Sequence, residues 1–425
     1  MKRHDALSTD PYKGVRDFYP ADWAKLEYAF WVMRMVLRLN GFEEYNASPL
    51  ELAEIYESKT SEEIVNEQTF TFTDRGDRRV TLRPEMTPTL ARMVAAKRRE
   101  LVFPLRWFSI PNVFRYERMQ RGRLREHYQL NVDILGIEDQ KADGEIIVLA
   151  YKLLRAFGAA DADFTVRVNS RTMLSAAAKA LEYSDAELID YMALLDRKNK
   201  MSAEEFETKR NQFRKNGTDV LELIEAGTNV EVDAEHKKFE GLLDAFKARG
   251  IGNVVFDPTI VRGFLYYTGI VFEVFDTNPE NSRSLFGGGR YDTLVSAFGG
   301  DSIPAIGFGM GDVTLLDFLE THKLLPEHLT GAPNLFIGTP LESDIQGAQR
   351  VAEMLRTSGV SVLVNVMNKA LKDQVKEASR RSIPFFIAYG SDEAERGVVK
   401  LKVLAESTEY EVAVQDIPAF IRGKK

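Results

Sequence analysis

The stretch that decides the fold runs from Val113 to Asp133 and reads VFRYERMQRGRLREHYQLNVD. Successive side chains of a β-strand point to opposite faces, so alternate residues share a face. In the first part of the stretch, this rule places Arg115 and Glu117 together. In the second part, the polar face carries His127, Gln129, Asn131 and Asp133. A strand pair with one apolar and one polar face predicts either the floor of a ligand pocket or a solvated surface.

The loop between these two predicted strands is dense in arginine for an acidic protein. Its arginines are Arg118, Arg121, Arg123 and Arg125. An anion would offset their mutual repulsion, because a charge pair about 4 Å apart contributes roughly 4 kcal/mol at an effective dielectric of about 20. The guanidinium fork also matches the geometry of phosphate. The loop is therefore predicted to be a phosphate-binding element or an exposed basic loop.

Glycine-dense stretches lie further along the chain, at residues 287–292 and 307–311. Neither has the Gly-Lys-Ser/Thr of the Walker motif or the G-x-G-x-x-G pattern of dinucleotide-binding folds. We therefore expect these glycines to allow the close approach of a ligand or a neighbouring strand. Upstream of them, Arg262 precedes the tyrosines Tyr266 and Tyr267. These three side chains would clamp a phosphate and a planar ligand, or would simply pack.

The N-terminal part of the chain predicts a helix followed by strands. Apolar residues recur at helical spacing over residues 23–37, with Asp22 before the run and Gly41 after it. An extended stretch follows at residues 42–49. Two strands, at residues 68–72 and 79–83, are separated by a turn-forming sequence and predict a hairpin.

A second helix is predicted to begin at Thr87 and Pro88, with the Thr87 hydroxyl as its cap. Glu85 would then lie at a strand-to-helix corner. Residues 170–250 are rich in helix-forming and charged residues, which indicates a helical insertion. Strand-like segments resume over residues 254–311, so we expect the insertion to interrupt a sheet.

A linker at residues 324–333 is predicted to precede a separate α/β domain. In this domain, apolar and helical segments alternate in the order β-α-β-α-β, which predicts a parallel sheet. Two further strands are predicted at residues 398–404 and 410–414.

The composition narrows the class of protein. The chain has 425 residues, 44% hydrophobic and 28% charged, which indicates a globular protein of two or three domains. It has no cysteine, which excludes disulfides, thiolate zinc sites and a cysteine nucleophile. Its five histidines leave little material for a metal cluster. No apolar run is long enough to span a membrane, so we expect a cytoplasmic protein. The net charge of −8 implies that any contact with nucleic acid is local.

Taken together, these motifs resemble those of the class II aminoacyl-tRNA synthetases, and among them the histidyl-tRNA synthetases. The resemblance covers nearly the whole chain. Residues 13–17 with Pro20 resemble the amino-terminal signature, residues 41–49 the dimer-interface motif 1, residues 113–133 motif 2 and residues 307–311 motif 3. The subfamily is indicated by three further stretches, at residues 82–87, 262–267 and 287–292.

This resemblance implies an α+β catalytic core over residues 1–325, built on a mixed and mainly antiparallel sheet. It implies a helical insertion at residues 170–250 and a C-terminal α/β anticodon-binding domain at residues 331–425. The implied activity is ATP-dependent conversion of L-histidine to histidyl-adenylate, followed by transfer to the 3′ end of tRNA(His). The resemblance also implies a homodimer, with Mg²⁺ arriving with ATP rather than at a metal site built by the protein.

The resemblance also carries residue roles. Arg115 and Arg262 are implied as the catalytic residues that hold the α-phosphate. ATP binding is implied for Arg115, Glu117, Arg123 and His127. Histidine binding is implied for Glu85, Thr87, Gln129, Asp133, Tyr266 and Tyr267. Contact with the tRNA acceptor end is implied for Arg118 and Gln120, and the last domain matches at Gly390, Glu393, Gly397 and Lys402.

Several positions depart from the family pattern. Motif 3 normally carries an arginine where this chain has Thr314, and a threonine does not hold a γ-phosphate as an arginine does. Leu265 replaces an acidic residue, His127 replaces an adenine-stacking phenylalanine, and Asp133 is shorter than the frequent glutamate. His127 keeps a flat ring that can stack.

Two other readings remain open from the sequence. A non-catalytic paralogue, acting as the regulatory subunit of ATP phosphoribosyltransferase, would explain Thr314, although Arg115, Arg262 and the last domain argue against it. A sensor of uncharged tRNA would be expected to carry a kinase or another extra domain.

Overall fold

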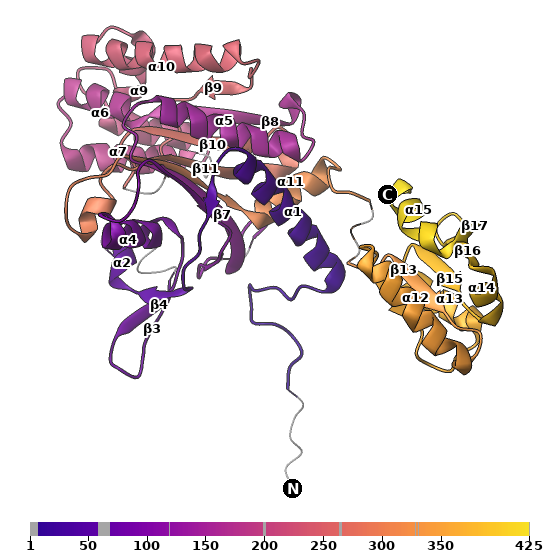
Figure 1. Cartoon of the computed structure of the whole chain (residues 1–425). Helices are drawn as coiled ribbons and strands as arrows, with labels where there is room; N and C mark the ends of the chain where they lie inside the picture. Colours follow the sequence, from indigo (N-terminus) through magenta and orange to yellow (C-terminus); the bar gives the residue numbers. More distant parts are fainter. Residues whose placement is uncertain are drawn as a thin grey trace. The chain divides into compact units, whose positions relative to one another are not determined.

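The computed structural model describes residues 7–57, 69–118, 120–198, 201–262, 266–327, 329 and 331–424. Two compact units share these residues: Met1–Asp17 with Leu26–Pro326, and Phe18–Lys25 with Glu327–Lys425. Figure 1 shows the chain coloured along its sequence. None of the described helices has both the length and the apolar composition needed to cross a bilayer.

The first unit is built on a sheet of nine strands among the described residues, in the order β1-β5-β7-β12-β11-β10-β8-β9, with β6 paired to β7. Only the pairs β1/β5 and β8/β9 are parallel. The predicted mixed and mainly antiparallel sheet is therefore confirmed. The strands are β1 (Glu43–Glu44), β5 (Leu105–Ser109), β6 (Asn112–Phe114), β7 (Glu126–Leu135), β8 (Phe164–Ser170), β9 (Val254–Phe256), β10 (Ile270–Asp276), β11 (Ser284–Arg290) and β12 (Ala305–Gly311).

The helix α1 (Pro20–Leu39) begins three residues before the predicted apolar run. Its buried face includes Leu26, Phe30, Met33 and Leu37, the spacing expected of one stripe on a helix. The unit also contains α2 (Glu54–Glu57), α4 (Thr87–Lys97), α5 (Lys141–Ala156) and α11 (Asp312–Thr321). The ten buried residues of the 16-residue α5 contribute much of the apolar contact beside the sheet.

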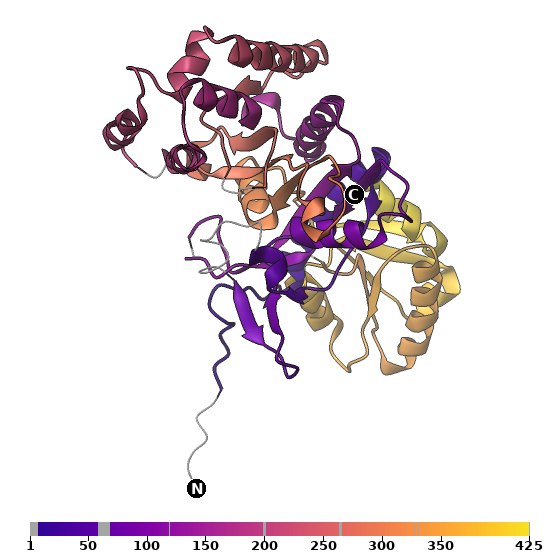
Figure 2. The ribbon, with the colours of Figure 1, turned by 90° about the vertical axis from the view of Figure 1, so that its left-hand side faces the viewer.

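Five helices fill the chain between β8 and β9. They are α6 (Arg171–Ala180), α7 (Asp185–Asp196), α8 (Ala203–Arg210), α9 (Val220–Ala226) and α10 (Val230–Ala248). Because β8 and β9 are parallel neighbours, the chain must cross over between them, and this helical segment is the crossover. The helices gather at one end of the first unit (Figures 1 and 2). The helices therefore stand between two strands of one sheet.

A small sheet of β2 (Leu50–Leu52), β3 (Phe70–Thr73) and β4 (Arg79–Leu82) contains the predicted hairpin. Gln68, the first residue of the predicted hairpin, lies outside the described part of the chain. The predicted cap of α4 is wrong: Met86 is the N-cap, Thr87 is already helical, and no side chain caps the helix. Instead, the Thr87 hydroxyl is hydrogen-bonded with Tyr266.

The second unit has the strand order β14-β13-β15-β16-β17. The first three strands in this order are parallel, as predicted, and the last two continue the sheet in antiparallel fashion. Its elements are β13 (Leu335–Gly338), α12 (Ile345–Thr357), β14 (Val362–Val364), α13 (Leu371–Arg380), β15 (Phe385–Ala388), α14 (Ser391–Arg396), β16 (Val398–Val403), β17 (Thr408–Ala413) and α15 (Ile417–Gly423).

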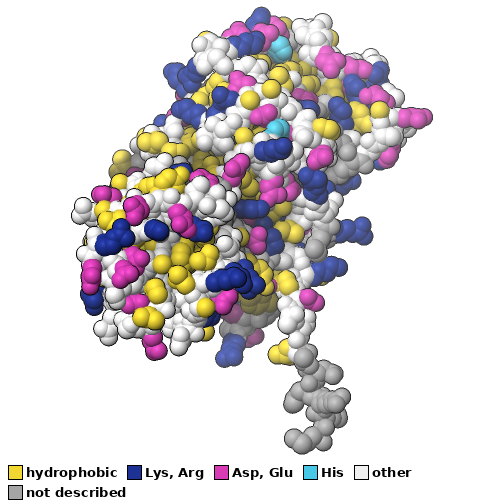
Figure 3. All heavy atoms as spheres, turned by 90° about the vertical axis from the view of Figure 1, so that its right-hand side faces the viewer, with side chains coloured by type: hydrophobic (Ala, Val, Ile, Leu, Met, Phe, Trp, Pro, Cys, Tyr) yellow, Lys and Arg dark blue, Asp and Glu magenta, His cyan; other side chains and the backbone are white. Residues whose placement is uncertain are grey.

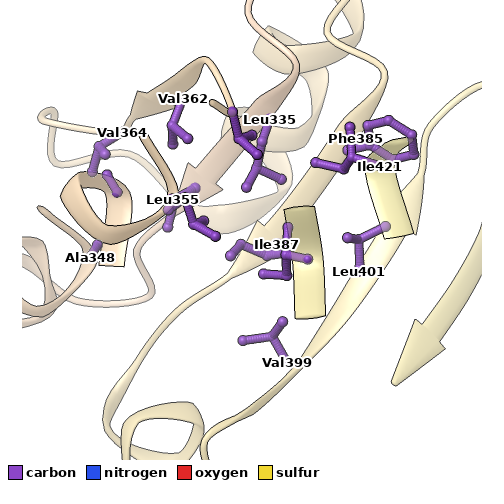
Figure 4. Close-up of a cluster of buried hydrophobic side chains, with 14 of the residues drawn as sticks. Leu335, Ala348, Leu355, Val362, Val364, Phe385, Ile387, Val399, Leu401 and Ile421 are labelled. Carbon is purple, nitrogen blue, oxygen red and sulfur yellow. The ribbon is translucent and has the colours of Figure 1, made fainter. Parts of the chain in front are cut away.

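The core of this unit lies between the sheet and two helices. Figure 4 shows strand residues such as Ile387 and Leu401 pointing toward Leu355 of α12 and Ile421 of α15. Two of the motif residues are structural here: the Glu393 carboxylate accepts the backbone N–H of Gly390, and Gly397 ends α14 in a left-handed conformation.

The surface gives no broad field of one charge on the face drawn in Figure 3, where basic and acidic side chains are interspersed. This agrees with the net charge of −8 and with local rather than general contact with nucleic acid.

The middle of β11 tolerates no side chain at Gly288. A Cβ there would lie 1.9 Å from the Gly307 carbonyl oxygen and 2.6 Å from the Phe308 Cα, and backbone atoms cannot move aside. We expect Gly288→Ala to destabilise the protein by about 3 kcal/mol or more, which a fall in the thermal unfolding midpoint would measure. Gly241→Ala is the control, because a Cβ at that position of α10 meets nothing within 4 Å and should stabilise the helix slightly. Equal midpoints for the two variants would contradict the prediction.

Candidate active site

A polar cavity of about 250 Å³ opens on the sheet of the first unit. The predicted polar face of β7 lines it with all four of its members, His127, Gln129, Asn131 and Asp133. The sequence left a pocket floor and a solvated surface open, and the structure shows the pocket floor. The remaining walls come from the start of α4, the loop after β6, the loop before β10, the strands β10 to β12, and α11.

Cross-strand register gives this face its depth. Asp133 of β7 pairs with Gly307 of β12, which pairs in turn with Gly289 of β11. One row along, Asn131 pairs with Gly309, which pairs with Gly287 and then with Glu273 of β10. Paired residues share a face, so glycines replace side chains in the middle of both rows.

Two contacts show why glycine is required there. A Cβ at Gly307 would lie 2.1 Å from the Asp133 Oδ1, and a Cβ at Gly287 would lie 2.1 Å from the Arg262 Nη1. The predicted close approach across these glycines is therefore confirmed, and the approaching groups are the side chains of the pocket itself.

The loop after β6 differs from its prediction. The strand ends at Phe114, and beyond it one backbone hydrogen bond, from the Arg115 N–H to the Arg125 carbonyl, continues the pairing. Arg115 and Glu117 nevertheless both reach the cavity. They do so from a loop and not from the predicted strand face.

Most of the arginines in this loop are engaged by neighbouring groups. Arg123 lines the cavity and lies 2.9 Å from Glu117. Arg121 donates to Asn281 at 3.1 Å. Arg125 stacks on the Tyr116 ring at 3.8 Å and donates to the Tyr12 hydroxyl. Stacking and hydrogen bonds to neutral groups have thus removed two of the four arginines from the predicted anion site.

Arg115 and Arg262 face the cavity from opposite sides. The Arg115 Nε donates to the Pro84 carbonyl at 2.8 Å, which fixes the side chain at the cavity that it lines. The Arg262 Nη1 lies 3.3 Å from Glu273, and its Nε is buried without a hydrogen-bond partner among the described residues. A cationic pair of this kind suits a phosphate group.

Arg262 has a left-handed backbone, with a φ of 54°. Such a conformation costs a non-glycine residue on the order of 1–3 kcal/mol and persists only where its surroundings hold it. The holder is Arg171, a buried residue at the start of α6, which donates to the carbonyls of Val261, Arg262 and Tyr267. Sequence reasoning missed Arg171, because nothing in the chain's spacing connects it with residue 262.

Asp133 lies at the buried end of the cavity. Its Oδ1 accepts a hydrogen bond from the Tyr291 hydroxyl, and its Oδ2 is buried without a partner among the described residues. Burial raises the pKa of this carboxyl to about 7, and the hydrogen bond from Tyr291 opposes that rise. The carboxylate is therefore poised to accept an N–H group from a ligand.

Tyr291 also explains a motif that the sequence had only matched. In the stretch 287–292, the glycines leave space, Tyr291 orients Asp133, and Arg290 turns away to pair with Asp143 at 2.6 Å. Asp292 accepts a hydrogen bond from Thr268. Alternation along β11 separates the residue that reaches the site from the residue that anchors the strand.

Glu85 and the paired tyrosines close the same end of the cavity. The Tyr266 hydroxyl donates to the Glu85 Oε2 at 2.9 Å, and both side chains are buried. Tyr267 packs against Tyr266, with ring centroids 4.9 Å apart. Of the stretch 262–267, residues 263–265, which include Leu265, lie outside the described residues.

The other end of the cavity holds His127 and Thr314. Burial, followed by the charges of Arg115 and Arg16, lowers the pKa of His127 to about 3, so its ring is neutral at physiological pH. The Thr314 hydroxyl donates to the Leu285 carbonyl at 2.6 Å and is therefore already engaged. Arg118 and Gln120 are exposed, and neither lines this cavity.

The cavity's donor set does not form a metal centre by itself. Among the described residues, no three or more His, Asp or Glu side chains gather in a metal-binding arrangement. The two carboxylates nearest the arginines, Glu117 and Glu273, each have an arginine partner.

Solved structures with the same fold include a histidyl-tRNA synthetase. The crystal structure of histidyl-tRNA synthetase from Nostoc sp. PCC 7120 matches 98% of this chain and 100% of that chain, with a TM-score of 0.80 and 23% identity. An ATP phosphoribosyltransferase regulatory subunit/histidyl-tRNA synthetase from Bacillus halodurans C matches 88% of this chain and 97% of that chain, with a TM-score of 0.74 and 23% identity. The fold is that of the class II aminoacyl-tRNA synthetases.

Sequence comparison identifies the family. The family model for histidyl-tRNA synthetase matches residues 14–313, and that for the anticodon binding domain matches residues 337–424. The histidine–tRNA ligase of Leptospira biflexa is 40% identical over 96% of both chains. The chloroplastic/mitochondrial histidine–tRNA ligase of Arabidopsis thaliana is 36% identical over 97% of this chain and 87% of the relative. The chain belongs to the histidyl-tRNA synthetase family and is an aminoacyl-tRNA synthetase.

The raised pKa of Asp133 predicts a pH dependence. Below about pH 7 the carboxyl is protonated in the free protein, and above it the group is ionised and can accept an imidazole N–H. The KM for histidine should therefore fall as the pH rises from 6 to 8. Asp133→Asn removes this titration and should raise KM by about tenfold to a hundredfold at pH 8, the usual contribution of a hydrogen bond to a charged group.

The substrate's own imidazole also titrates near pH 6.5, but it does so equally with both proteins. The measurement is therefore the ratio of the two KM values across the pH range. A ratio that does not change with pH would contradict the assignment of Asp133.

Proposed function

We propose that this chain activates L-histidine with ATP and transfers the histidyl group to the 3′ end of tRNA(His). In the first step, a histidine carboxylate oxygen attacks the α-phosphorus, a new P–O bond forms, and pyrophosphate leaves as the bond to the β-phosphate breaks. In the second step, a ribose hydroxyl of the terminal adenosine attacks the carbonyl carbon, and AMP leaves. The observation that carries the proposal is one cavity lined both by arginines and by a buried carboxylate oxygen that has no partner among the described residues.

The length of β7 along the cavity can be compared with the length of the two substrates. Asp133 and His127 are six residues apart, which corresponds to about 20 Å at about 3.3 Å per residue. That length accommodates an amino acid followed by a nucleotide along one strand. Histidine is assigned to the end with Asp133, and the adenine ring to the end with the neutral ring of His127.

Histidine recognition is assigned to the buried polar groups. The imidazole would donate to Asp133 and pack against Tyr266 and Tyr267. The ammonium group would bind Glu85 and Thr87, which enter the cavity from the start of α4. Gln129, which is two rows nearer to His127 than Asp133 is, would contact the carboxylate end.

Catalysis is assigned to positioning and charge stabilisation. Arg115 and Arg262 would hold the α-phosphate from two sides, and Arg123 with Glu117 would orient the rest of ATP. A preorganised cation is worth more in a cavity than in water because it needs no reorganisation as charge develops. Mg²⁺ would enter with ATP, held mainly by phosphate oxygens, since the carboxylates nearby are already paired with arginines.

Contact with tRNA is assigned to the exposed part of the arginine loop. Arg118 and Gln120 lie beside the cavity-lining Gly122 and Arg123 along the chain, which suits a nucleic-acid end that must enter the cavity. The second unit is assigned to anticodon binding by its family model. The enzyme would act in the cytoplasm.

A homodimer is the proposed assembly. Leu50, Leu52 and Phe72 remain 42% to 50% exposed on the three-stranded sheet. The pairing of Leu52 with Val80, and of Val80 with Phe72, places them on one apolar face, which a second copy of the chain would cover.

The regulatory-subunit reading is not favoured. The relatives that share 33% to 40% identity with this chain over nearly its full length are named histidine–tRNA ligases. The cavity also retains Arg115, Arg262 and an intact histidine end.

The first test is histidine-dependent exchange of labelled pyrophosphate into ATP. We expect exchange with histidine, and Arg262→Ala should slow it by about a hundredfold to a thousandfold, as loss of one preorganised donor typically does. Arg106→Ala is the control, because that arginine pairs with Glu145 outside the cavity.

The proposed function and the role of Arg262 are tested by different outcomes. A wild-type protein that exchanges with no amino acid would overturn the proposed function. A change below about threefold in Arg262→Ala would overturn the role of that residue alone.

A second test divides the two reaction steps. Arg118→Ala and Gln120→Ala should lower the rate of histidyl transfer to tRNA by about tenfold, which corresponds to about 1.4 kcal/mol of lost contact. Pyrophosphate exchange, measured without tRNA, should change less than twofold. Equal losses in both assays would show that these residues serve ATP or the fold and not the tRNA.

A further inference from the structure

Beside the active-site cavity lies a second cavity of about 80 Å³. Both cavities are lined by Gly122, Leu285 and Thr314, so these residues form a common wall. The second cavity is also lined by Arg283, the residue immediately before β11.

Thr314 and Arg283 meet at Gly122. A Cβ at Gly122 would lie 3.3 Å from the Thr314 Cγ2 and 3.8 Å from the Arg283 Cδ. Gly122 has a φ of 76° and carries no side chain that could separate the two. The Arg283 side chain therefore approaches, from the second cavity, the wall that the two cavities share, near the end of the Thr314 side chain.

The charges around Arg283 favour an anion. The groups that act on its guanidinium are Arg123, whose charge lowers its pKa after burial does, and Glu117. The Glu117 carboxylate is only 2.9 Å from Arg123 and is already balanced by it. The guanidinium groups of Arg123 and Arg283 thus share the Glu117 carboxylate. One positive charge is left uncompensated.

The acidic residues of the second cavity, Glu280 and Asp317, are not among the charged groups that act on the Arg283 guanidinium. Asp317 interacts with Arg121 and Glu320 rather than with Arg283. Arg121 is itself bonded to Asn281. Within the described chain, Arg283 therefore differs from its neighbour Arg121 in being left for a ligand.

We propose that Arg283 binds the γ-phosphate of ATP and takes the place of a cation at position 314. The inference rests on the proposed function, because it extends the same nucleotide site. The Thr314 hydroxyl is committed to the Leu285 carbonyl and presents no charge. Arg115 and Arg262 are assigned to the α-phosphate. Arg283 and Arg123 are therefore the cations that meet the far end of the triphosphate.

The experiment compares ATP and AMP with the full-length protein. Arg283→Ala should raise the KM for ATP in pyrophosphate exchange by about tenfold to a hundredfold, the usual loss for a hydrogen bond to a charged group. The Kd of AMP, measured by calorimetry, should change less than twofold, because AMP lacks the β- and γ-phosphates. An equal loss for both nucleotides would overturn the inference.

Arg121→Ala is the matched control, since it removes a neighbouring arginine of the same cavity that is bonded to Asn281. It should leave the KM for ATP within about threefold of the wild-type value. If it raised the KM as much as Arg283→Ala does, general basic charge rather than Arg283 would be responsible, and the inference would fail.

A rescue variant tests whether a cation at position 314 can do what Arg283 is proposed to do. Thr314→Arg placed in the Arg283→Ala background should return the KM for ATP to within about threefold of wild type. No recovery would overturn the claim that Arg283 stands in for a cation at position 314. A wild-type protein without histidine-dependent exchange would instead refute the proposed function, whereas an active wild type with an unchanged Arg283→Ala variant refutes only this inference.

Discussion

The site depends on the register between β7, β12, β11 and β10. That register places the polar residues of β7 in rows with glycines, so Asp133 faces Gly307 and Asn131 faces Gly309. The sheet can then hold charged side chains flat against its own surface, where any larger residue would fill the space. A shift of β7 by one residue would turn Asp133 to the opposite face of the sheet and bring its neighbour Val132 toward the cavity. Recognition is thus fixed by strand pairing before any loop contributes.

Loops then add Arg115 and Arg262 to the cavity, and each is held by a residue that does not line it. Arg115 is fixed through Pro84, and the strained backbone of Arg262 is held by Arg171. Arg16 plays a comparable part from the amino-terminal signature, since it pairs with Asp312, whose other oxygen accepts the backbone N–H of Tyr128 in β7. Arg16 of the amino-terminal signature does not line the cavity itself, and it supports a strand that does.

Much of this arrangement could be predicted from the sequence because it rests on period-two alternation, which is local. The polar face of β7, the close approach at Gly287 and Gly307, and the α/β order of the second unit all follow from spacing. What failed also had a physical reason. The strand was extended too far beyond Phe114 because polarity says nothing of where a pairing partner ends, and Thr87 was read as a cap although its hydroxyl serves Tyr266. Contacts such as Tyr291 with Asp133 join residues 158 positions apart, which spacing cannot reveal.

The free protein stores unsatisfied groups where the substrates are proposed to bind. The Asp133 Oδ2 and the Arg262 Nε are both buried without partners among the described residues, and each such group costs about 1–3 kcal/mol. A ligand that supplies an N–H to the first and a phosphate oxygen to the second removes both costs at once. The same groups would discriminate against a substrate lacking an imidazole N–H, because it would leave the carboxylate unpaired. Under the proposed function, specificity and catalysis would therefore draw on the same sheet surface, whose buried polar groups would gain partners only when amino acid and nucleotide are both bound.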